Sequence, residues 1–167
     1  FLDEMGVLLG LMRTHARAAP GDRAYDFKPF YRGTKVSVIG AITVSKVLAV
    51  MTLDDSMDAA AFKVYVSQCL VPQLWKGAVV VMDNLAAHKV EAIAPLIEAV
   101  GARILYMSPY SPEFNPIEHW WSQLKAFLRQ FSPTTSQRVD MLIKIAMNLM
   151  NPSHLRNWFA HCCYCPS

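Results

Sequence analysis

Apolar and polar residues in the first third of the chain follow a pattern typical of β-strands. Residues 35–43 (KVSVIGAIT) and 47–53 (VLAVMTL) are rich in β-branched side chains and are separated by a short polar turn, which predicts a β-hairpin. The opening residues 1–4 (FLDE) are expected to be the end of a buried strand whose earlier part is missing. Residues 10–34 combine Arg, Gly and Pro without a period, so we expect a loop there, with at most one short strand.

The remainder of the chain alternates helical spacing with short apolar runs. Helical spacing predicts a set of helices over 58–75, 89–100, 116–131, 136–150 and, as a short piece, 155–159. The apolar runs 78–82 (AVVVM) and 103–107 (RILYM) predict two strands, the first buried on both faces. This order predicts an α/β fold with a mixed central β-sheet flanked by α-helices. We expect a single domain over residues 1–167.

Composition narrows the class of protein. The chain has 167 residues, of which 53% are hydrophobic and 17% charged, against roughly 25% charged in an average domain. This composition excludes a disordered chain, and no apolar run approaches the ~20 residues that cross a bilayer. The net charge of +3 permits a polyanionic partner without requiring one. Four cysteines are too few for a secreted disulfide scaffold, so we expect a reducing intracellular compartment.

Three carboxylates occupy positions suited to a catalytic site. Asp83 directly follows the strand predicted at 78–82, and Asp3 is expected at the end of the opening strand. Glu118 lies one turn into the helix that follows a proline-rich loop. If the first and fourth strands are neighbours, the three side chains meet at one sheet edge. Clustered carboxylates stay ionised only with a cation, and Mg²⁺ or Mn²⁺ suits such oxygen ligands. Two such ions would form the usual clamp for displacement at phosphorus.

Each acid also has an ordinary explanation. Asn115, Pro116 and Glu118 fit an N-cap, a first-turn proline and a reciprocal capping residue, so Glu118 taken alone is better explained as a cap. Asp83 and the residue after it are equally well explained as turn residues. At the start of the chain, either Asp3 or its neighbour Glu4 can be the inward carboxylate. The combination of the three acids therefore carries the hypothesis.

Two segments resemble a known family. Residues 79–89 (VVVMDNLAAHK) and 109–125 (PYSPEFNPIEHWWSQLK) resemble the catalytic domain of DDE transposases of the Tc/mariner superfamily, in particular its bacterial insertion-sequence branch. The 34 residues between Asp83 and Glu118 match the spacing of that group. Asp3-Glu4 and residues 39–41 (IGA) also fit the family pattern, and the resemblance extends to about Tyr164.

The resemblance implies a ribonuclease-H-like fold and a metal-dependent polynucleotidyl transferase. Asp3, Asp83 and Glu118 would be the catalytic, metal-binding triad for two Mg²⁺ or Mn²⁺ ions. The implied reaction is nicking of DNA at transposon ends, followed by attack of the freed 3′-hydroxyl on target DNA. The implied partners are transposon-end and target DNA and, in the active complex, a second copy of the chain. The implied location is the bacterial cytoplasm, in association with the nucleoid.

Four further positions are candidates for contacts with DNA. Asn84 and His88 could position the scissile phosphate, although a turn and a first helical turn explain them slightly better. Lys89 and Lys125 could bind DNA phosphates, which would make affinity salt-dependent, and exposed, solvated lysines are the default alternative.

Aromatic and cysteine residues near these segments have mainly structural explanations. Trp121 is predicted to pack in the core, whereas Trp120 is a candidate for a DNA or partner surface. Tyr110, Pro112 and Pro116 are expected to stiffen the loop before Glu118. The cysteines within 162–165 suggest zinc only weakly, because no second ligand pair has suitable spacing.

The chain also departs from the family pattern. A helix-turn-helix region normally precedes the first aspartate and is absent here, and we expect a truncated first strand because only two residues precede Asp3. Two alternatives therefore stay open beside the transposase domain. One is a ribonuclease-H-like nuclease without strand transfer, and the other is an inactive remnant that binds DNA or a partner.

Overall fold

The first three strands form an antiparallel sheet in the order β1-β2-β3. The computed structural model describes residues 1–25, 35–85, 88, 91–109 and 111–164. The strands are β1 (Leu2–Leu8), β2 (Lys35–Ile42) and β3 (Val47–Leu53). The predicted hairpin is confirmed as the pair β2 and β3.

Strand β1 is longer than predicted. It continues to Leu8 because Met5 and Val7 alternate inward and pair with the buried residues Val38 and Val36 of β2. The exposed Gly6 does not interrupt this alternation. Asp3 is therefore the second residue of a seven-residue strand, and the expectation that it ends its strand is wrong.

The second half of the chain supplies the helices and a parallel strand pair. Helix α1 (Ala59–Val64) continues into a π-helical segment and a 3-10 turn that ends at Gln73. Strands β4 (Val79–Met82) and β5 (Arg103–Tyr106) pair in parallel, with α2 (Ile93–Glu98) between them in the chain. The last helices are α3 (Ile117–Phe131), α4 (Ser136–Asn148) and α5 (Pro152–His161).

Several predicted bounds differ from those observed. Helix α2 starts at Ile93 instead of 89, and residues 89–90 lie outside the described residues. Helix α5 is longer than the predicted piece at 155–159, because Pro152 at its first turn and the Asn151 N-cap extend it toward the N-terminus. Strand β4 is not buried on both faces, since Val79 is 38% exposed.

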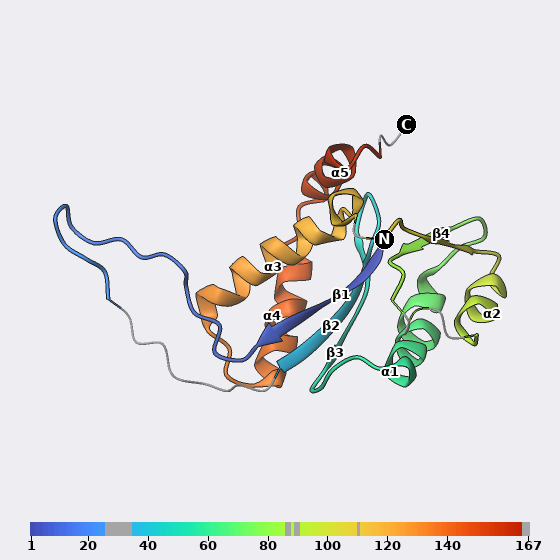
Figure 1. The fold of residues 1–167 in the computed structure, drawn as a ribbon, viewed down its shortest axis with the longest axis horizontal. Coiled ribbons are helices and arrows are strands. Elements are labelled where there is room, and N and C mark those ends of the chain that lie inside the picture. The colour runs from blue at the N-terminus through green and yellow to red at the C-terminus, as the bar shows by residue number, and fades with distance from the viewer. Residues whose placement is uncertain (26–34, 86–87, 89–90, 110, 165–167) are drawn as a thin grey trace.

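Two cores lie on the two faces of the β1-β2-β3 sheet (Figure 1). On one face, α3 and α4 pack against Val36 and Val38 of β2. On the other face, α1 and the segments that follow it pack against Ile39 and Ala41, which alternate with the first pair along the strand. Strand β4 lies beside β1, although the hydrogen-bonded ladders among the described residues are β1-β2-β3 and β4-β5. The predicted α/β class with parallel and antiparallel strands flanked by helices is confirmed.

Both tryptophans of α3 belong to the core. Trp120 and Trp121 are each 1% exposed and stack on each other with ring centroids 4.5 Å apart. The prediction for Trp121 is confirmed, and the assignment of Trp120 to a DNA or partner surface is wrong. The rings fit there because Gly40 of β2 presents no side chain beneath them. Within the described part of the chain, no helix has the length and apolarity needed to span a membrane.

Candidate active site

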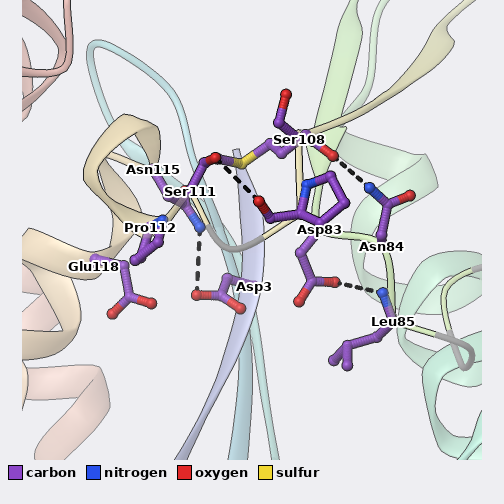
Figure 2. Close-up of a pocket in the computed structure, with 11 residues that line it drawn as sticks. Asp3, Asp83, Asn84, Leu85, Ser108, Ser111, Pro112, Asn115 and Glu118 are labelled. Carbon is purple, nitrogen blue, oxygen red and sulfur yellow. Dashed lines mark hydrogen bonds between the residues drawn. The ribbon is translucent and has the colours of Figure 1, made fainter.

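The three acids predicted from the sequence line one cavity. Asp3 comes from β1, Asp83 follows β4, and Glu118 lies in the first turn of α3. The cavity has a volume of about 400 Å³, and the loop of residues 107–115 supplies much of its remaining wall. Figure 2 shows the carboxylate of Asp3 between those of Glu118 and Asp83. Segments far apart in the sequence thus bring three carboxylates to one place.

Asp3 is the most buried of the three acids, with 8% of its surface exposed. Its Oδ1 accepts a hydrogen bond from the Glu4 amide at 2.8 Å, and its Oδ2 accepts one from Trp121 Nε1 at 3.2 Å. The pKa of Asp3 is raised to about 7, mainly by burial and also by the nearby charges of Glu118 and Glu4, against the opposing effect of these hydrogen bonds. The charged form that binds a cation is therefore costly here unless a cation compensates it.

Asn115 has a different role from the predicted helix cap. Helix α3 has no side-chain cap, and Asn115 Nδ2 instead donates to Asp3 Oδ2 at 3.4 Å. Asn115 is 5% exposed, and its Oδ1 is buried without a hydrogen-bond partner among the described residues. No local pattern predicts this contact, apart from the position of Asn115 in the proline-rich loop. Glu118 is exposed and lines the cavity.

Asp83 lies at the opposite wall, and its side chain is 40% exposed. Its Oδ1 accepts a hydrogen bond from the Leu85 amide at 3.0 Å and lies 2.6 Å from Nδ1 of His88. The next residue, Asn84, donates through Nδ2 to the carbonyl of Met107 (Figure 2). Asn84 thereby connects the end of β4 to the loop after β5 and also lines the cavity.

His88 is fully buried, with 0% exposure, and its ring lies between two carboxylates. Nε2 is 3.2 Å from Glu4 Oε2, on the side opposite to the contact with Asp83. Burial lowers the pKa of His88, but the hydrogen bonds and charges of Glu4 and Asp83 outweigh burial and raise it overall. A ring without exposed surface cannot contact DNA in this arrangement, so the DNA-contact assignment of His88 is corrected.

The two lysine candidates differ in what the structure describes. Lys125 lies half-buried on α3 and lines a groove of about 240 Å³ with Glu118, Ser122 and Arg129. This groove begins at Glu118, which also lines the cavity, and runs along α3 past Lys125 and Arg129. Lys89 lies outside the described residues, as does Tyr110.

The family model of the DDE superfamily endonuclease matches residues 1–140, which make up most of the chain. The chain belongs to the DDE superfamily endonucleases. No curated protein matches the sequence.

Several solved structures of the Mos1 transposase are similar to this DDE endonuclease chain. The Mos1 paired-end complex with the left transposon end has a TM-score of 0.76 at 16% identity, covering 95% of this chain and 50% of that one. A mariner Mos1 paired-end complex with Mg has a TM-score of 0.73 at 16% identity, covering 95% and 50%. The catalytic domain of Mos1 mariner transposase has a TM-score of 0.60 at 14% identity, covering 83% and 73%. These likenesses confirm the ribonuclease-H-like fold, and the chain spans about half the length of the paired-end chains.

The donor set of this DDE endonuclease chain suits a hard divalent cation. Three carboxylates, one of them with its pKa raised by burial and by like charges, line a single cavity. Across the described ranges, no three His, Cys, Asp or Glu side chains lie close enough to enclose an ion as they stand. The three carboxylates therefore share one cavity and have the oxygen donors that suit a divalent cation, but as they stand they do not enclose an ion. Of the C-terminal cysteines, Cys162 is buried and Cys163 exposed, and Cys165 lies outside the described residues.

Proposed function

We propose that this chain is the catalytic domain of a Tc/mariner-type DDE transposase. In this proposal it cleaves DNA strands at the ends of an insertion element and transfers them to target DNA, in the bacterial cytoplasm. The observation that carries the proposal is the shared cavity lined by Asp3, Asp83 and Glu118. Membership of the DDE superfamily endonucleases supports the same reaction class.

Asp3, Asp83 and Glu118 would hold two Mg²⁺ or Mn²⁺ ions. When bound, these ions supply Lewis-acid activation of the attacking hydroxyl and stabilisation of the leaving oxygen at phosphorus. Trp121 and Asn115 orient the Asp3 carboxylate through hydrogen bonds to one oxygen. The desolvated, mutually repelling carboxylates favour cation binding because a cation removes both costs. The description of one similar Mos1 complex as containing Mg supports this choice of ion.

DNA would enter at the open side of the cavity. Asn84 lies at its wall, and Lys125 continues the groove along α3, where both could contact phosphates of the bound strand. Lys89 is also proposed to contact phosphates, on the basis of its position in the sequence alone. The substrates would be transposon ends and target DNA, and the active complex would contain two copies of the chain. The description of a similar structure as a paired-end complex supports this arrangement.

Nicking of supercoiled plasmid in Mn²⁺ tests the catalytic assignment. We expect the wild type to nick, and Asp83→Ala or Glu118→Gln to reduce the rate by about 100-fold or more while the circular dichroism spectrum stays that of the folded protein. Glu113→Gln is the matched control, because Glu113 is exposed in the same loop and does not line the cavity. Retained nicking by a folded Asp83→Ala or Glu118→Gln variant would remove that residue from the triad.

A joining assay separates the transposase from the alternatives. A pre-nicked end fragment with a free 3′-hydroxyl is incubated with plasmid, Mn²⁺ and the protein. Joined product supports the transposase, and nicking without joining supports a ribonuclease-H-like nuclease. Absence of both activities, together with Mn²⁺ binding no stronger than that of Asp83→Ala, would identify an inactive remnant.

A further inference from the structure

The buried His88 and the half-buried Glu4 form a pair behind the cavity that the proposed chemistry does not use. Neither side chain lines the cavity, although each is linked to a residue that does. Glu4 is adjacent to Asp3 in β1, and His88 lies 2.6 Å from Asp83. Because successive side chains of a strand point to opposite faces, β1 can present Asp3 toward α3 and Glu4 toward His88. The contacts of Asp3 with Trp121 and of Glu4 with His88 agree with this division.

The ring of His88 is held from several sides. Phe62, itself fully buried, packs against the ring with centroids 4.4 Å apart. The His88 amide donates to the carbonyl of Leu85 at 3.0 Å, and the Tyr106 hydroxyl donates to the carbonyl of His88 at 3.2 Å. Because ring and backbone are both restrained, the direction of the Nδ1 atom is set by the fold. Glu4 contacts the opposite side of the ring, with Oε2 3.2 Å from Nε2.

The two carboxylate oxygens of Asp83 differ in their contacts. Oδ1 receives the Leu85 amide at 3.0 Å and faces His88 Nδ1 at 2.6 Å. Oδ2 has no hydrogen bond within the part of the chain that the structure describes, and the residue lines the cavity. A carboxylate whose first oxygen is held in this way has its second oxygen oriented before any ligand binds. Groups that hold a metal ligand in this manner commonly change metal affinity 10–100-fold when removed.

We propose that Glu4 and His88 are positioning residues for Asp83: the ion-pair contact of Glu4 with Nε2 orients the imidazole, and the contact of Nδ1 with Oδ1 holds the Asp83 carboxylate, so that Oδ2 is presented to a divalent cation. This inference rests on the proposed metal site formed by Asp3, Asp83 and Glu118. It assigns Glu4, the neighbour of Asp3, a function separate from that of Asp3. It also explains why the chain buries a histidine between two acids at the edge of its active-site cavity.

Mn²⁺ titration of the DNA-free protein, followed by electron paramagnetic resonance, tests the pair without any catalytic readout. We expect Glu4→Ala to weaken Mn²⁺ binding about 10-fold or more, because the imidazole loses the partner that orients it. Glu4→Gln retains an oxygen acceptor for Nε2–H, so its affinity should stay within about 3-fold of wild type. Glu98→Gln, which removes an exposed charge at the end of α2, is the matched control and should leave affinity unchanged.

The two Glu4 variants separate positioning from a plain effect of charge. Equal weakening by Glu4→Gln and Glu4→Ala would show that only the negative charge matters, and unchanged affinity in both would show that the contact is irrelevant. Either result overturns the inference while leaving the metal site intact. Absence of Mn²⁺ binding by the wild type overturns the metal site and the inference together.

A measurement on the wild type covers the case in which a Glu4 variant fails to fold. Nitrogen-15 NMR of the His88 ring at pH 7 in the metal-free protein should show a proton on Nδ1. An unprotonated Nδ1 would overturn the inference, because the ring could not then donate to Asp83.

Discussion

Gly40 connects the packing of the fold to the geometry of the cavity, and Gly40→Ala tests that connection. Gly40 pairs with Asp3 across β1 and β2. A Cβ atom at this position would lie 2.6 Å from Cη2 of Trp121 and 2.8 Å from Cζ3 of Trp120. Both distances are below the 3.4 Å at which ordinary van der Waals contact begins. The two rings are stacked and 1% exposed, so neither can move away without displacing other core residues.

The size of the effect follows from overpacking in a closed core. Adding one carbon where neighbours cannot yield typically costs about 1–3 kcal/mol of unfolding free energy. For a chain of this length, that corresponds to a decrease in melting temperature of roughly 2–12 °C. A displaced Trp121 would also move its Nε1 away from Asp3 Oδ2, now 3.2 Å distant. We therefore expect weaker Mn²⁺ binding as well as lower stability.

Gly6→Ala is the matched control, since Gly6 lies in the neighbouring strand β1. A Cβ atom there would meet only the flexible end of the Lys35 side chain, which can move aside. Both substitutions gain the same roughly 0.5–1 kcal/mol from replacing glycine in a strand, so the difference between them isolates the steric cost.

Urea unfolding followed by circular dichroism measures both variants, and Mn²⁺ titration gives the second readout. We expect Gly6→Ala to be as stable as wild type or slightly more stable, and Gly40→Ala to be less stable than Gly6→Ala by the amount above. If the two variants have equal unfolding free energies, the reasoning that the tryptophan pair cannot yield is refuted.

Two further predictions concern Asp3 and its surroundings. Because the pKa of Asp3 is raised from 3.8 to about 7 in the folded chain, the folded state binds a proton more tightly than the unfolded state. The unfolding free energy of the metal-free protein should therefore fall as pH rises from about 4 to about 7, by up to about 4 kcal/mol. The raised pKa of His88 acts in the same direction above its ordinary value of 6.5. Urea titrations across this pH range give the slope of the unfolding free energy against pH. This slope should be shallower in Asp3→Asn, and a wild-type unfolding free energy that does not change with pH would contradict the prediction. Trp121→Phe removes the indole donor to Asp3 while keeping an aromatic ring. Its Mn²⁺ affinity, measured by calorimetry, should fall several-fold. An unchanged affinity would show that this hydrogen bond does not orient Asp3.

The amino-acid sequence by itself determined the local elements and the chemical candidates. The hairpin of β2 and β3, the amphipathic helix α3 and the order of strands and helices follow from periodicities within each segment. The burial of Trp121 follows from its place on the apolar stripe of α3. Asp83 follows an apolar run and Glu118 follows a proline-rich loop, and these two acids line one cavity with Asp3.

Tertiary structure alone decided which side chains support those acids. The contacts of Asn115 and Trp121 with Asp3 join residues 112 and 118 positions apart in the chain. The ring of His88 is placed by Glu4, far earlier in the sequence, and so is buried instead of facing DNA. Trp120 is buried because Gly40, on another element, leaves room for its ring. Local patterns reveal which face of an element is apolar, whereas the partner of a polar side chain is chosen only when distant segments pack together.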